Sequence, residues 1–228
     1  MSNYDFLESL DETKPLVNMV KDSLENAIFK CKFKPGDRLV EEDLSKTLKI
    51  SRGPIREAFR LLEKDGYIKI YPRKGALVKA ISFGDICEIY QVRGVLEGLA
   101  AKLFSHSAED KEISRLKSVY EKMEVTLKDK NIDNYKKLNK EFHNIYVKGC
   151  NNSRIRKQSN VYLKQITWFQ NITLSSLHRP DNSKAEHGRI LEAFLKRNPE
   201  EAELAAKEHI ENSMDYYIER WSHLDSNA

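Results

Sequence analysis

A cluster of basic side chains in this 228-residue sequence has the spacing of a nucleic-acid contact. Ser51, Arg52 and Arg56 open a segment with helical spacing. Arg52 and Arg56 are four residues apart and share a helix face, where a guanidinium can hold guanine O6 and N7 or a phosphate. Ser51 and the free N–H groups of a first helical turn also suit a phosphate. An arginine pair alone is equally typical of a solvated helix face.

The charge of the surrounding segment favours the nucleic-acid interpretation. Between Leu44 and Ala80 the chain has ten Lys or Arg and three Asp or Glu, whereas 23 basic residues face 22 acidic ones from Ile81 onward. A second basic group, Arg73-Lys74-Gly75, falls within the same block. A basic excess confined to one segment is typical of a module that binds a polyanion. The sequence therefore predicts two modules, of which the first meets nucleic acid.

Histidines form the second group of chemically capable side chains. Asn139 and His143 are four residues apart and project from one helix face, while His187 and His209 fall in two further helical segments. Imidazole nitrogen suits zinc, nickel and similar divalent ions. Three histidines on three helices are also typical of surface or hydrogen-bonded core residues. The spacing alone leaves both interpretations open.

A metal-dependent enzyme is the alternative function, because three histidines and an open position also describe a catalytic zinc site. Such an enzyme needs a base beside the bound water. Glu141 is two residues from His143 and points about 160 degrees away around a helix, and Glu186 adjoins His187 and is similarly off the face. The sequence has no H-E-x-x-H, G-x-S-x-G or phosphate-loop motif. These features favour a binding protein over an enzyme.

The elements that must position the basic residues read as three helices and a hairpin. The turn residues Pro35-Gly36, Gly53-Pro54 and Gly66 divide this part of the chain. Ser51 is expected to cap the third helix, whose apolar face would be Ile55, Ala58, Phe59 and Leu62. The expected helices are 16–29, 41–48 and a third ending at Lys64, followed by strands 67–71 and 76–80. This order predicts a winged helix-turn-helix.

Apolar residues at helical spacing predict six helices in the remainder of the chain. Their expected ranges are 83–105, 109–128, 132–148, 153–174, 181–196 and 199–221. The fold class is therefore mainly α, with a winged helix-turn-helix at residues 1–80 and an all-helical, six-helix bundle at residues 81–228.

Composition predicts a cytoplasmic protein. No apolar stretch approaches the ~18 residues that span a bilayer, and the acidic start of the chain does not resemble a signal or transit peptide. The three cysteines, Cys31, Cys87 and Cys150, are far apart, which argues against a disulfide framework. No membrane partner is expected.

The first third resembles the N-terminal domain of GntR-family bacterial transcription regulators. The matching segments are 35–39, 42–45, 50–63, 66–68 and 74–78. In that family the serine and two arginines of the SR-x-P-x-R-E-A stretch, and residues at the wing glycine, contact operator DNA. Gly53 stands where the family usually has threonine, so a polar contact is expected to be missing there. Arg38 is either a phosphate contact or a loop ion-pair partner of Asp37. The implied DNA-binding set is Arg38, Ser51, Arg52, Gly53, Arg56, Lys74 and Gly75.

Residues 83–222 resemble the FCD effector domain of the FadR-type subgroup. The matching segments are 93–97, 138–143, 186–193 and 202–210. In many such domains a carboxylate or amide and three histidines bind a divalent metal, which here implies Asn139, His143, His187 and His209 as ligands and zinc or nickel as the ion. Asn139 replaces the usual aspartate and is a neutral, weaker ligand. The ligands and ion together carry about +2, which suits a carboxylate effector.

The resemblance also implies partners. Arg93 is either a carboxylate partner for a small organic-acid effector or an i,i+4 ion-pair partner of Glu97. One recognition helix covers only a half-site, so a homodimer on double-stranded operator DNA is expected. The predicted function is a transcriptional regulator, expected to be a repressor, whose operator affinity a small carboxylate controls.

Overall fold

The computed structural model describes residues 15–71, 75–172 and 180–225, which divide into two units. The winged-helix unit comprises the described residues up to Phe83 and those of Leu163–Ser176. The helical unit comprises Gly84–Tyr162 and the described residues from position 180 onward. The boundary expected between residues 80 and 81 stays a prediction.

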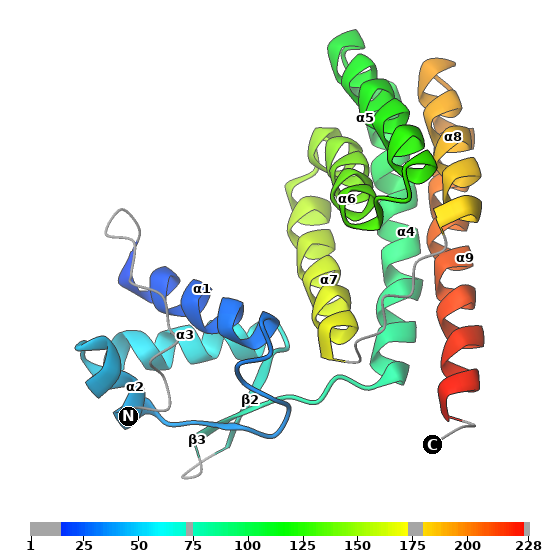
Figure 1. Cartoon of the computed structure of the whole chain (residues 1–228). Helices are drawn as coiled ribbons and strands as arrows, with labels where there is room; N and C mark the ends of the chain where they lie inside the picture. Colours follow the sequence, from blue (N-terminus) through cyan, green and yellow to red (C-terminus); the bar gives the residue numbers. More distant parts are fainter. Residues whose placement is uncertain (1–14, 72–74, 173–179, 226–228) are drawn as a thin grey trace. The chain divides into compact units, whose positions relative to one another are not determined.

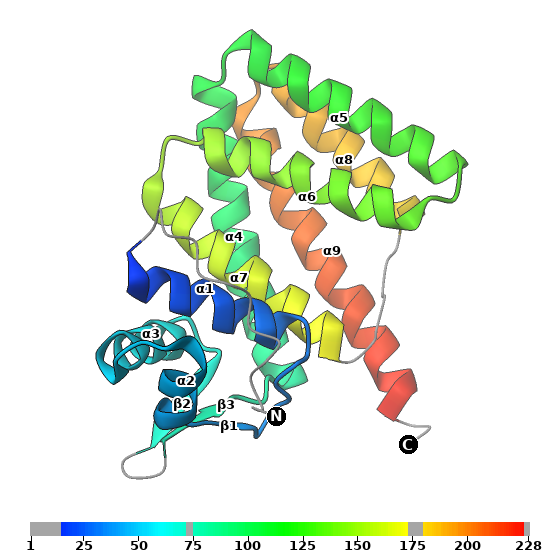
Figure 2. The same ribbon diagram turned by 60° about the vertical axis from the view of Figure 1, so that its left-hand side comes forward.

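Three helices and a small antiparallel sheet make up most of the winged-helix unit (Figures 1 and 2). The sheet has the strand order β1-β3-β2, with Arg38 opposite Leu77 and Ile68 opposite Val78. The sequence did not predict β1, because a two-residue strand is too short to show an alternating pattern. The elements are α1 (Leu16–Phe29), β1 (Arg38–Leu39), α2 (Glu41–Leu48), α3 (Arg52–Lys64), β2 (Ile68–Tyr71) and β3 (Gly75–Val78).

Helix α3 forms as its sequence predicts. Its buried residues are Ile55, Ala58, Phe59 and Leu62, which recur at helical spacing on one face. Ser51 occupies the N-cap position in extended backbone, but its side chain makes no capping hydrogen bond. Beyond the C-terminus, Gly66 has φ of +83°, a left-handed conformation that glycine adopts without strain. One side of α3 is thus fixed in the core and the other is left for contacts.

Within the described residues, six helices follow the winged-helix elements, as predicted, and the last ten residues of α7 are assigned to the winged-helix unit. Helices α8 and α9 pack together, and α5 packs on both α6 and α8 (Figure 2). Their bounds are α4 (Phe83–Ser107), α5 (Asp110–Lys128), α6 (Ile132–Gly149), α7 (Ser153–Ile172), α8 (Pro180–Leu195) and α9 (Pro199–Asp225). The predicted and observed ends differ by four residues at most within the described ranges.

Close packing of α4 against α9 depends on a small residue in α4. A Cβ atom on Gly98 would lie 3.0 Å from the Glu203 carbonyl oxygen and 3.3 Å from Lys207. Both values are shorter than ordinary van der Waals contact, so a larger residue would force the two helices apart. This approach positions α9 beside the middle of α4.

Within the described residues, no helix is long and apolar enough to cross a membrane.

Candidate metal centre and DNA-binding surface

Three histidines from three helices of the helical unit converge on one point. His143 comes from α6, His187 from α8 and His209 from α9. The Nε2 atom of His143 lies 3.2 Å from Nε2 of His187 and 3.2 Å from Nε2 of His209. The three side chains are 5%, 0% and 4% exposed. Nitrogen atoms at this spacing can all reach one ion at the ~2.0–2.1 Å of a zinc–imidazole bond.

Carboxylates on neighbouring helices hold the outward-facing nitrogens of two of these histidines. His143 Nδ1–H donates to Glu97 Oε2 over 2.6 Å, and His209 Nδ1–H donates to Glu186 Oε2 over 2.8 Å. A carboxylate acceptor places the ring proton on Nδ1, which leaves the Nε2 lone pair free to bind a metal. Both imidazoles are therefore oriented toward the shared point.

The third histidine is the most deeply buried. His187 Nδ1 lies 3.2 Å from Ser183 Oγ, one helical turn earlier on α8. Burial, with a smaller effect of the other two imidazoles, lowers the pKa of His187 well below 6.5. Burial also lowers the pKa of His209 to about 4, and the Glu186 carboxylate opposes that shift only in part. Both rings are thus neutral at physiological pH, which is the protonation state that binds metal.

Asn139 lies on the same face of α6 as His143, one turn earlier. Its Oδ1 atom is buried and accepts no hydrogen bond within the described part of the chain. An unsatisfied buried carbonyl oxygen costs about 1–3 kcal/mol, and metal coordination would remove that cost. This oxygen therefore fits the fourth-ligand role that the resemblance implied.

Glu97 joins the histidine cluster to Arg93. Its Oε1 atom accepts from Arg93 Nε over 2.5 Å, and its Oε2 atom accepts from His143 and from the Tyr146 hydroxyl. Burial by itself would raise the pKa of Glu97, but Arg93 and then His143 outweigh it and hold that pKa well below its ordinary range. Of the two interpretations of Arg93, the ion pair with Glu97 is present, and Arg93 is only 8% exposed. Its role toward an effector stays a prediction.

The sequence did not reveal the roles of Glu97 and Glu186. Glu186 does point away from its neighbour His187, as its spacing predicts, but it reaches His209 on the adjacent helix instead. The charges of Glu97, Glu186 and Arg93 sum to −1 around the triad. With a divalent ion bound, the whole group would therefore carry about +1 (+2 − 1), which is less positive than the +2 expected from the ion and its ligands alone.

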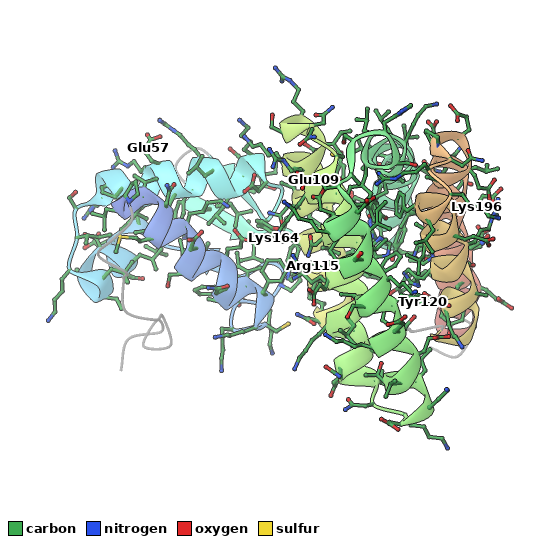
Figure 3. All side chains as sticks on the ribbon, turned by 90° about the horizontal axis from the view of Figure 1, so that it is seen from above. Glu57, Glu109, Arg115, Tyr120, Lys164 and Lys196 are labelled. Atoms are coloured by element: carbon green, nitrogen blue, oxygen red, sulfur yellow. The ribbon has the colours of Figure 1, made fainter. Side chains whose placement is uncertain are left out.

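The predicted DNA-contacting residues of α3 lie on its exposed side. Arg56 Nε donates to Glu41 over 2.7 Å, and Arg52 Nη2 lies 3.3 Å from Glu42, both carboxylates coming from α2. Exposed ion pairs of this kind are worth about 0–1 kcal/mol, so phosphate or base edges can replace them at little cost. Glu57 projects from α3 (Figure 3) and pairs with Arg60 on the same helix over 2.6 Å.

The other predicted contacts lie at the start of α3 and at the wing. Ser51 and Gly53 are exposed, and a Cβ atom on Gly53 would meet nothing within 4 Å. At the wing, Gly75 has φ of +84°, and a Cβ there would lie 3.5 Å from Arg38 Nε. The structure thus brings Arg38 beside the wing glycine. Lys74 lies outside the described residues.

Comparison with known proteins agrees with both halves of this description. Residues 16–78 match the bacterial regulatory proteins of the gntR family, and residues 88–212 match the FCD domain. The chain belongs to the GntR family and carries an FCD domain. It is 32% identical over 216 residues to the uncharacterized HTH-type transcriptional regulator YdhC of Bacillus subtilis (strain 168), covering 94% of this chain and 95% of that protein.

More distant relatives give the same result. The GntR/FCD chain is 22% identical to the HTH-type transcriptional repressor RspR of Escherichia coli (strain K12) over 89% of each chain. Its fold is similar to the solved structure of E. coli McbR/YncC, with a TM-score of 0.68 at 17% identity over 91% of this chain and 99% of the other. The predicted fold class and the DNA-binding regulator are confirmed. The relatives are transcriptional regulators, so the enzyme alternative is not supported.

Proposed function

We propose that this GntR/FCD regulator is a repressor whose operator affinity is controlled by a small carboxylate bound at or near a divalent ion. The observation that carries the proposal is the convergence of three buried Nε2 atoms, two of them with a carboxylate behind the opposite ring nitrogen. Such paired imidazoles are typical of metal ligands. An FCD domain implies a small ligand for the helical unit.

The ligands in this proposal are Asn139, His143, His187 and His209, and zinc or nickel is the ion that suits them. When bound, the ion would supply a Lewis-acidic position for a carboxylate oxygen of the effector. The protein's own contribution is to keep the imidazoles neutral and oriented. Arg93 lies one turn from Glu97 at the edge of this cluster and is the proposed second contact for the effector.

Operator recognition is assigned to the exposed side of α3 and to the wing. Arg52 and Arg56 would leave Glu42 and Glu41 for DNA, with Ser51 at a phosphate and Arg38, Lys74 and Gly75 at the backbone beside the wing. A single recognition helix reads one half-site, so we infer a homodimer acting on chromosomal DNA in the cytoplasm. The similarity to RspR, which is a transcriptional repressor by name, supports this direction of regulation.

Elemental analysis combined with zinc titration tests the metal centre. The purified chain is expected to hold about one divalent ion, and His143→Ala and His209→Ala are expected to lose it. His106→Ala is the matched control, because His106 is exposed on α4 and outside the cluster. If both triad variants bind zinc as tightly as the parent, the centre is wrongly placed.

Operator binding is then measured with and without a panel of small carboxylates, which tests control by an effector. Turnover of the same compounds tests the enzyme alternative.

A further inference from the structure

Helix α7 contributes residues to the cores of both units. Ile155, near its start, is buried in the core of the helical unit. Trp168, near its end, is 0% exposed in the core of the winged-helix unit, where its ring meets Tyr67 edge to face at 5.7 Å between centroids. Tyr67 in turn meets Phe29 of α1 at 5.6 Å. The last ten residues of α7 are thus part of the DNA-binding unit.

Polar side chains of α7 satisfy the carbonyl ends of two helices in that unit. Gln165 Nε2 donates to the Asp65 carbonyl oxygen over 2.7 Å, and Asn171 Nδ2 donates to the Phe29 carbonyl oxygen over 3.0 Å. Asp65 is the C-cap of α3 and Phe29 the last residue of α1. The final carbonyl groups of a helix lack partners inside it, so α7 supplies two of those missing donors.

Two local features fit this arrangement. A Cβ atom on Gly66 would lie 2.6 Å from Gln165 Nε2, so the glycine also leaves the space that Gln165 occupies. Glu25, which is 3% exposed on α1, pairs with Lys21 over 2.9 Å and with Lys164 of α7. A buried carboxylate needs such partners, and one of its two cations comes from α7.

We propose that Gln165 is a positioning residue for the recognition helix, because its side-chain amide holds the carbonyl group at the C-terminal end of α3. Gln165 acts on DNA only through the C-terminal end of α3. The proposal rests on α3 being the recognition helix.

Tryptophan fluorescence of the full-length chain tests the packing without DNA or metal. The sequence has two tryptophans, so Trp221→Phe leaves Trp168 as the sole emitter. Acrylamide is expected to quench Trp168 at least about fivefold less efficiently than free tryptophan amide, because the ring is enclosed. Quenching as efficient as that of the free amide would overturn the proposal. This result does not depend on whether the helical unit binds an ion.

Operator binding by Gln165 variants tests the positioning role. The probe is a duplex that the parent chain selects from random DNA, compared with an unselected duplex. Gln165→Met keeps the length and loses the donor, and it is expected to lower the preference for the selected duplex by about fivefold, the value of one hydrogen bond. Gln165→Lys keeps a donor and is expected to retain most of that preference. Lys157→Met, exposed on the first half of α7, is the matched control.

The outcomes separate positioning from general stability. If Gln165 positions α3, the Gln165→Met chain is expected to show a lower ratio of affinity for the selected duplex to affinity for the unselected duplex. Its unfolding temperature is expected to stay near that of the parent. The backbone amides of residues 62–66 are expected to exchange hydrogen faster than in the parent. A Gln165→Met chain with unchanged preference, or one that loses both duplexes equally with a lower unfolding temperature, contradicts the proposal. If the parent itself selects no duplex, the proposed function fails, and the fluorescence result still decides whether α7 packs in the winged-helix unit.

Discussion

Replacing Glu97 with glutamine is expected to weaken metal binding at the histidine cluster. One carboxylate oxygen accepts from Arg93 and the other from His143 Nδ1 and the Tyr146 hydroxyl. An amide has one acceptor oxygen and one NH2 group, so it cannot satisfy both sides. If the NH2 group faces His143, the ring proton moves to Nε2, the atom required for metal binding.

The size of the effect follows from the surroundings of Glu97. Loss of an outer hydrogen-bond partner typically weakens metal binding ~10- to 100-fold. Arg93, which is 8% exposed, would lose its counter-charge, and breaking a buried pair costs about 3–5 kcal/mol in the free energy of unfolding. The double variant Arg93→Met/Glu97→Gln removes the orphaned charge. It is expected to recover most of the stability without recovering the metal affinity.

Chelator competition with zinc, together with urea denaturation, measures the two quantities separately. Glu141→Gln is the control, because Glu141 lies on α6 two residues from His143 but forms an exposed pair with Arg115. It is expected to leave both quantities near those of the parent. Zinc affinity of the Glu97→Gln chain within about threefold of the parent would refute the reasoning, since an outer partner is worth at least tenfold.

Further predictions concern single positions. Arg52→Ala and Arg56→Ala are each expected to cost ~1–3 kcal/mol of operator binding, measured by anisotropy, with unchanged folding; unchanged affinity in both would remove the recognition assignment. Gly53→Thr is expected to fold normally and tighten operator binding, because the space for a Cβ is open; weaker binding would contradict this. Asn139→Asp is expected to tighten zinc and weaken a carboxylate effector, since it adds a negative charge; no change in either affinity would place Asn139 outside the site. The free energy of unfolding of the metal-free protein is expected to decrease as pH falls from ~6.5 towards 4. In this range the unfolded chain binds a proton at His209, whereas the folded chain, in which burial lowers the pKa of His209 to about 4, does not. Urea midpoints that stay constant over this range would contradict it.

Local patterns in the sequence were sufficient for the fold class and for the helix that carries the basic residues. The apolar face of α3, Ile55 through Leu62, recurs within one helix and needs no information from the rest of the chain. The basic segment that contains Arg52 and Arg56 is likewise contiguous. For this reason, the winged helix-turn-helix and the six following helices were predictable, whereas β1 was too short to have a pattern.

Contacts between helices could not be read from the sequence. His143, His187 and His209 could be placed on helices by their spacing, but only the packing of α6, α8 and α9 shows that their Nε2 atoms meet. The partners Glu97 and Glu186 lie 46 and 23 positions from the histidines they hold.

The shared role of α7 is a second property that only the tertiary structure decided. Its sequence predicts an amphipathic helix, but nothing in that pattern indicates that Ile155 and Trp168 enter different cores. Helical periodicity reports which side of one helix is buried, because it depends on residues a few positions apart. Which neighbour covers that side depends on how distant segments pack in space, and that information exists only once the chain has folded.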